Sequence, residues 1–157
     1  MKIIEIRGAN YKGKVNETLK ACRAVIINNG NILLAHDLKF DQYMIPGGLM
    51  EDNETEEQCV IREVSAYTGE AIDVVTPLIE IHEFYGTTEW IGKYFIARST
   101  GRSVVNEKKE QLIRLECEWM NFDKALKMFS EYKAYFVKDP IKSGLYLREY
   151  NVLKNVK

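Results

Sequence analysis

Two consecutive glycines and a short acidic stretch form the first candidate site in this sequence. Gly47 and Gly48 allow backbone conformations closed to other residues, and they let another group come near the main chain. Glu51, Asp52 and Glu54 follow directly. Carboxylate oxygens are the ligands that hard divalent cations prefer, and Glu51 and Asp52 on the loop could reach toward a bound metal ion. These residue types indicate an acidic site beside an accessible main chain.

The acidic loop leads into a helix that we predict from Thr55 to Thr68. Thr55, with Gln58 three residues later, gives a capping-box pattern at the start of this helix. Gly69 is a typical stop signal at its end. Apolar residues recur at helical spacing along it, namely Cys59, Val60, Val64 and Tyr67. The pair Arg62-Glu63 is therefore predicted to lie on a helix.

Strand signals precede and follow this helix. The Asn28-Asn29-Gly30 segment between two apolar runs predicts a tight hairpin, and the apolar run from Val25 to Ile27 indicates a strand covered on both faces. The expected strands are 18–28, 31–36, 40–45, 74–85, 90–97 and 117–120, and the later helices are 123–129 and 140–153, the last broken or bent near Gly144. This order predicts an α+β fold with a mixed sheet and helices on its faces.

The stretch from Gly48 to Gly69 resembles the Nudix box. The family pattern is a glycine, five residues, a glutamate, seven residues, then Arg-Glu, an apolar residue, any residue, Glu-Glu, any residue and a glycine. Its matching positions are Gly48, Glu54, Arg62, Glu63, Val64 and Gly69. The resemblance implies that residues 1–157 form a single Nudix domain, an α/β/α sandwich with a mixed sheet between helices. It implies a pyrophosphohydrolase that uses Mg²⁺ or Mn²⁺ on a nucleoside diphosphate linked to another moiety.

The resemblance also assigns roles to residues. It makes Glu63 a metal ligand and catalytic residue, it places Gly47 and Gly48 on the substrate loop, and it gives Glu54, Arg62 and Gly69 structural roles in the box. Two further acidic ligands of the family are absent, because Ala66 and Tyr67 stand there. Neither a methyl nor a phenol group replaces a carboxylate as a ligand. If hydrolysis survives, other carboxylates must take over, and the candidates are Glu51, Asp52, Glu70, Glu80, Glu83, Glu107, Glu110 and Glu116.

Three functions stay open on these grounds. The first is the metal-dependent hydrolase, weakened by the degenerate box. The second is a catalytically inactive Nudix-fold module that binds a nucleotide, a metabolite or a protein partner, and Ala66 and Tyr67 favour it. The third is a structural subunit that pairs with a second copy as a homodimer. His82 is expected to be a hydrogen-bonded structural histidine, because a single histidine in an apolar strand seldom acts as a base.

Composition excludes several other classes. The net charge of the 157 residues is −1, so no basic excess indicates nucleic-acid binding. No apolar run approaches the roughly 20 residues of a membrane span. The three cysteines, Cys22, Cys59 and Cys117, lie far apart, which argues against a disulfide framework and indicates a reducing cytoplasm. The sequence does not identify the substrate.

Overall fold

A computed structural model describes residues 1–104 and 115–156 of the chain. The strands are β1 (Lys2–Arg7), β2 (Glu17–Asn28), β3 (Asn31–Asp37), β4 (Gln42–Met44), β5 (Gly47–Leu49), β6 (Glu70–Tyr85), β7 (Thr88–Ser103) and β8 (Leu115–Asn121). The helices are α1 (Glu56–Thr68), α2 (Phe122–Ser130), the short 3₁₀ helix η2 (Tyr132–Tyr135) and α3 (Pro140–Leu153). No helix in the described ranges is long and apolar enough to cross a membrane.

The strands form one mixed sheet. Its order is β1-β6-β7-β2-β3-β4, with β5 beside β2 and β8 beside β3. The pairs β1–β6 and β2–β7 are parallel, and the other pairs are antiparallel. The central strand β2 therefore links the long β6–β7 hairpin to the smaller group of strands around β3.

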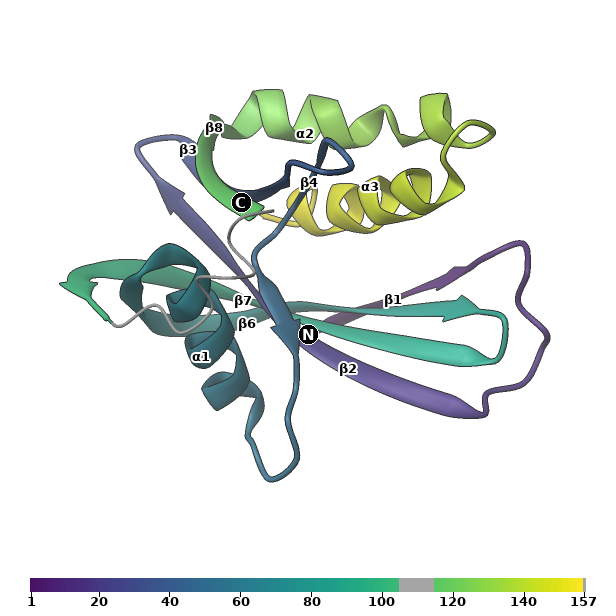
Figure 1. Cartoon of the computed structure of the whole chain (residues 1–157), viewed down its shortest axis with the longest axis horizontal. Coiled ribbons are helices and arrows are strands. Elements are labelled where there is room, and N and C mark those ends of the chain that lie inside the picture. Colours follow the sequence, from purple (N-terminus) through teal and green to yellow (C-terminus); the bar gives the residue numbers. More distant parts are fainter. Residues whose placement is uncertain (105–114, 157) are drawn as a thin grey trace.

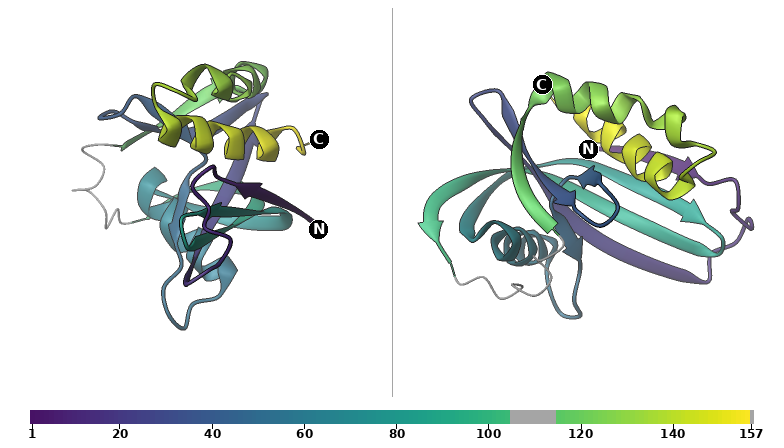
Figure 2. Two further views of the ribbon diagram at one scale, coloured as in Figure 1. Left: turned by 90° about the vertical axis from the view of Figure 1, so that its right-hand side faces the viewer. Right: turned by 45° about the horizontal axis from the view of Figure 1, so that its top comes forward.

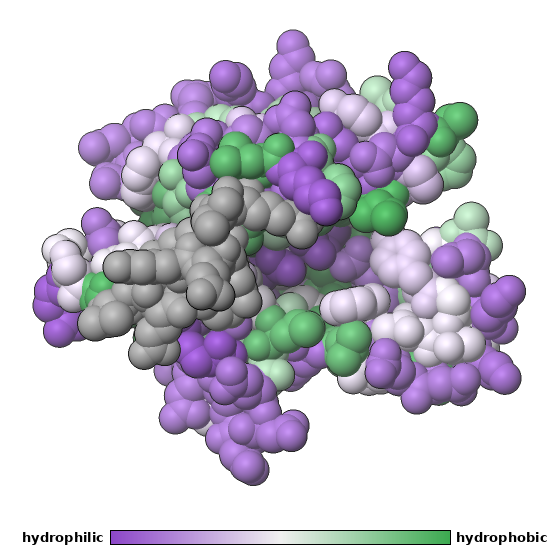
Figure 3. All heavy atoms as spheres, viewed as in Figure 1, coloured by the Kyte–Doolittle hydropathy of each residue, from purple (hydrophilic) through white to green (hydrophobic). Residues whose placement is uncertain are grey.

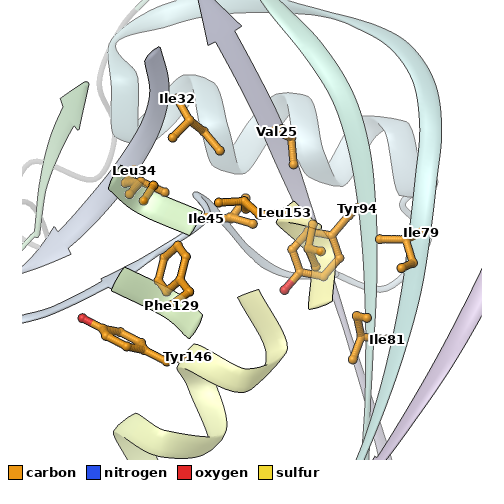
Figure 4. Close-up of a cluster of buried hydrophobic side chains, with 12 residues drawn as sticks. Val25, Ile32, Leu34, Ile45, Ile79, Ile81, Tyr94, Phe129, Tyr146 and Leu153 are labelled. Carbon is orange, nitrogen blue, oxygen red and sulfur yellow. The ribbon is translucent and has the colours of Figure 1, made fainter. Parts of the chain in front are cut away.

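Helices cover both faces of this sheet (Figures 1 and 2). Val25 and Ile26 are neighbours on β2, yet they belong to two different core clusters because successive side chains of a strand point to opposite faces. The cluster around Val25 lies between the sheet and the helices α2 and α3, and it includes Tyr94, Phe129 and Leu153 (Figure 4). The cluster around Ile26 includes residues of α1. The predicted α/β/α sandwich is thus confirmed.

Several local predictions are confirmed by the backbone. Asn29 and Gly30 form the turn between β2 and β3 with φ angles of 52° and 78°. Helix α1 carries both hydrogen bonds of the Thr55–Gln58 capping box, and Gly69 ends it in the left-handed conformation with φ 73°. The box segment therefore folds as its local sequence directs.

Three expectations about the elements need correction, and one strand was not expected at all. The strand expected at 40–45 is shorter, because β4 begins at Gln42 after Asp41 turns the chain with φ 47°. The first strand, β1, was not predicted. Helix α3 is not broken at Gly144; this glycine instead makes room for Tyr85, whose hydroxyl would lie 2.9 Å from a Cβ there. The run Val25–Ile27 is buried only at its first two residues, because Ile27 is 41% exposed near the turn.

His82 joins the two strands of the β6–β7 hairpin, as the structural reading expected. Its Nε2 lies 2.7 Å from Glu80 Oε1 and its Nδ1 lies 2.9 Å from Glu89 Oε2. Burial alone would lower the pKa of His82, but the hydrogen bonds to Glu89 and Glu80 favour the imidazolium and raise this pKa above its ordinary value. The ring therefore donates both N–H groups when it is protonated.

This geometry predicts a pH dependence of stability. The folded-state pKa of His82 is raised, so its contribution is fully present below the unfolded-state pKa of about 6.5 and is lost as pH rises through the folded-state pKa. The native chain should therefore be more stable than His82→Gln at low pH. This difference in the free energy of unfolding should shrink as the pH rises through this window. Urea unfolding of both proteins measures it; a difference that is constant with pH would contradict the assignment.

Candidate functional site

Gly47 and Gly48 let β5 approach both β2 and helix α1 closely. Strand β5 pairs with β2, with Gly47 opposite Arg23 and Gly48 opposite Cys22. A Cβ at Gly47 would lie 2.2 Å from the carbonyl oxygen of Cys22, and one at Gly48 would lie 2.5 Å from the carboxyl carbon of Glu63. Both distances are too short for a side chain. The glycines thus bring β5 onto β2 and let the Glu63 carboxylate lie against the main chain.

Arg62 fastens the acidic loop to α1. Its Nε donates to Glu54 Oε2 at 2.6 Å, and its Nη2 donates to Glu54 Oε1 at 3.0 Å and to the Leu49 carbonyl at 3.1 Å. The hydrogen bonds from Arg62 lower the pKa of Glu54 to about 2, although partial burial opposes this. A two-point guanidinium–carboxylate pair fixes orientation as well as distance. This arrangement supports structural roles for Glu54 and Arg62.

Glu63, the predicted metal ligand, lies in the same ion-pair network. It is 4% exposed, and its Oε1 accepts a hydrogen bond of 2.8 Å from Arg62 Nη1. The Arg62 guanidinium therefore donates hydrogen bonds to two carboxylates at once, those of Glu54 and Glu63. The Glu63 carboxylate therefore shares one guanidinium with Glu54 and, at 3.6 Å, with Glu51.

The positions three and four residues beyond Glu63 offer no carboxylate. Ala66 is 7% exposed, and Tyr67 is partly buried, with the Cys117 thiol 3.7 Å from its carbonyl oxygen. Within residues 1–104 and 115–156, no group of three or more histidine, cysteine, aspartate or glutamate side chains is arranged to hold a metal ion. Mg²⁺ and Mn²⁺ require several oxygen ligands. The described side chains therefore do not fit such an ion beside Glu63.

Three of the other candidate carboxylates have hydrogen-bond partners within the protein. Glu80 pairs with His82, Glu70 accepts a hydrogen bond from the Ser99 hydroxyl, and Glu83 Oε2 accepts one of 3.1 Å from Tyr85. Three others are exposed, namely Glu51, Asp52 and Glu116, and Glu51 lies 3.6 Å from Arg62. Hydrophilic side chains gather over the loop before α1 (Figure 3). Two more, Glu107 and Glu110, lie outside the described residues.

Helix α3 contributes a buried polar network that sequence reasoning missed. Glu149 is fully buried; it accepts hydrogen bonds of 2.6 Å from the Ile45 N–H and from the Tyr94 hydroxyl, and one of 2.9 Å from Arg148 Nε. Burial opposes ionisation, but the adjacent Arg148 lowers the pKa of Glu149 below its ordinary value. Arg23 donates to the Ile45 carbonyl at 3.0 Å.

This network fixes the backbone of Ile45, just before the two glycines. Ile45 lies two residues before Gly47, and both its N–H and its carbonyl are bound by charged side chains. The carboxylate of Glu149 thereby connects α3 to the site from the opposite face of the sheet. No pattern in the sequence marks Arg148 or Glu149, because charged helix residues are usually solvent-exposed.

Comparisons with known proteins agree with this architecture. The chain is similar to the MutT Nudix hydrolase of Burkholderia pseudomallei, with 25% identity, a TM-score of 0.57, and coverage of 68% of this chain and 84% of that chain. A Nudix hydrolase from Nitrosomonas europaea is 17% identical, with a TM-score of 0.58 and coverage of 88% and 91%. An ADP-ribose pyrophosphatase of Streptococcus suis is 14% identical, with a TM-score of 0.52 and coverage of 67% and 75%.

The family assignment comes from the sequence itself. No curated protein matches the chain at a significant level. The sequence model of the family described as the NUDIX domain, however, matches residues 18–139, which is well over half of the chain and includes the whole segment from Gly48 to Gly69. Together with the mixed sheet between helices and the Arg62-centred loop, this match shows that the chain belongs to the Nudix family.

Proposed function

We propose that the chain, as one domain, binds a small nucleotide-type metabolite and hydrolyses pyrophosphate bonds inefficiently or not at all. The observation that carries this proposal is the state of Glu63. The box glutamate is buried, bonded to Arg62 and followed by Ala66 and Tyr67 where the family has carboxylates. The Arg62–Glu54 pair that holds the loop is present. Among the described residues, however, no cluster of acidic, histidine or cysteine side chains surrounds Glu63 to complete a metal site.

A screen for hydrolysis and binding tests this proposal. Nucleoside triphosphates, ADP-ribose, dinucleoside polyphosphates and nucleotide sugars are incubated with the chain and Mg²⁺ or Mn²⁺, and release of phosphate or pyrophosphate is followed. Calorimetry measures binding of the same compounds. We expect at least one compound to bind without efficient turnover. The matched variants are Glu63→Gln and Glu57→Gln, the second altering an exposed glutamate on the same helix.

The outcomes are distinct. Rapid turnover that Glu63→Gln abolishes and Glu57→Gln preserves would overturn the proposal. Absence of binding by every nucleotide-type compound would also overturn it.

Within this proposal, inefficient hydrolysis is the alternative to an inactive module, because Glu63 keeps its place against Gly48. In that case carboxylates from outside the box must assist, and Glu107 and Glu110 are candidates from the sequence. Slow Mn²⁺-dependent turnover that disappears in the double variant Glu107→Gln/Glu110→Gln, while nucleotide binding persists, would support this reading over the inactive module.

A further inference from the structure

A second candidate site lies at the C-terminal end of α1, next to Glu70. A cavity of about 180 Å³ opens there between the end of α1 and the face of the sheet, including β8. Its apolar lining comes from Ile26, Leu33 and Ile72, each at most 7% exposed. The cavity is too small for a drug-sized ligand, since such pockets measure about 300–1,000 Å³, but its volume suits a single flat ring system.

Glu70 gives this cavity one negatively charged wall. It follows Gly69 directly and stands where the family prefers an apolar residue. The Thr68 hydroxyl donates to the Val64 carbonyl at 2.9 Å and accepts a hydrogen bond of 3.2 Å from the Glu70 N–H, which ties the backbone of Glu70 to the end of α1. The Ser99 hydroxyl donates to Oε2 of the carboxylate. Among the described residues, no hydrogen bond is seen to the remaining oxygen, Oε1.

Trp119 gives the cavity an aromatic wall. It lies on β8 opposite Leu33 of β3, and its side chain lines the cavity although it is 47% exposed. An exposed indole beside an apolar floor is a stacking surface for a flat heterocycle, because every such ring has a π face. Carboxylate and indole therefore border the same small space, one as a hydrogen-bond acceptor and the other as a stacking partner.

We propose that this cavity binds a planar heterocycle that carries an exocyclic amino group, as the adenine base does. The ring would lie against Trp119 over the apolar floor, and the amino group would donate to Glu70 Oε1. A carboxylate accepts from an amino group and repels a carbonyl oxygen, so the site selects for the amine. This inference rests on the proposed function, because it names the part of a nucleotide-type ligand that the chain recognises.

Tryptophan fluorescence gives a direct test. The chain has two tryptophans, so Trp90→Phe leaves Trp119 as the only reporter. In this background, free adenine should quench the emission of Trp119. Purine, which lacks only the amino group, should bind at least about tenfold more weakly. Glu70→Leu should weaken adenine binding by a similar factor, whereas Asp73→Leu, which alters an exposed carboxylate on the same strand, should leave it unchanged.

Calorimetry with Trp119→Leu complements the fluorescence. Loss of the stacking surface should weaken adenine binding at least about tenfold. Equal affinity for adenine and purine, or unchanged adenine binding in Glu70→Leu, would overturn the cavity proposal. If an adenine nucleotide binds the native chain and Glu70→Leu equally well, the cavity proposal fails and the proposed function stands. If adenine binds in the cavity but no nucleotide-type compound binds the native chain, the proposed function fails instead.

Discussion

Replacing Glu149 with alanine is expected to lower the free energy of unfolding by about 3–5 kcal/mol. The carboxylate is fully buried and accepts hydrogen bonds from Ile45, Tyr94 and Arg148. Its removal leaves the Arg148 guanidinium with Glu83 as its nearest carboxylate, at 3.5 Å. A buried guanidinium that keeps only this longer contact, together with the unpaired Tyr94 hydroxyl and Ile45 N–H, is far more costly than a lost surface contact. Urea unfolding followed by circular dichroism measures the change.

Two controls separate this effect from a general sensitivity to substitution. Glu17→Ala removes an exposed carboxylate from β2 and should change the free energy of unfolding by less than about 0.5 kcal/mol. The triple variant Glu83→Gln/Arg148→Met/Glu149→Leu removes all three buried charges of this network and should be less destabilised than Glu149→Ala. If Glu149→Ala cost no more than Glu17→Ala, the network beneath α3 would have no role in stability.

The second large effect is expected from restoring the box. Ala66→Glu/Tyr67→Glu places two carboxylates one helical turn from Glu63, on the same face of α1. The double variant should bind Mn²⁺ at least about tenfold more tightly than the native chain, a change of about 1.4 kcal/mol. The matched control is Ala66→Gln/Tyr67→Gln, which adds side chains of the same shape without charge and should bind no better than the native chain.

The local parts of the fold could be predicted from the sequence. The Asn29-Gly30 turn, the Thr55 cap and the Gly69 stop each depend on residues close together in the chain, and each is confirmed. Strand β1 was missed because its structure depends on a distant partner. It pairs in parallel with residues 79–84 of β6, and no turn signal joins the two strands.

The candidate site, too, could be predicted from the sequence only in its local contacts. The pairing of Arg62 with Glu54 follows from the box spacing and is observed in the structure. The hydrogen bond from Arg62 to Glu63 and the support of Ile45 by Glu149 could not be predicted. Arg62 and Glu63 are neighbours, but the contact between them depends on the side-chain conformations. The contact between Ile45 and Glu149 joins segments 104 residues apart, and a helix sequence gives no sign that one of its glutamates is fully buried. The sequence suggested Glu70 as a replacement metal ligand, and the structure instead places it in the lining of a cavity.

Titration of Mn²⁺ into the native chain tests the central claim most directly, with free Mn²⁺ followed by electron paramagnetic resonance. The claim is that Glu63, paired with Arg62 and lacking carboxylates at positions 66 and 67, does not form a working metal site. The native chain and Glu63→Gln should therefore bind Mn²⁺ equally weakly, while Ala66→Glu/Tyr67→Glu binds it. Binding by the native chain that is at least about tenfold tighter than that of Glu63→Gln would contradict the claim.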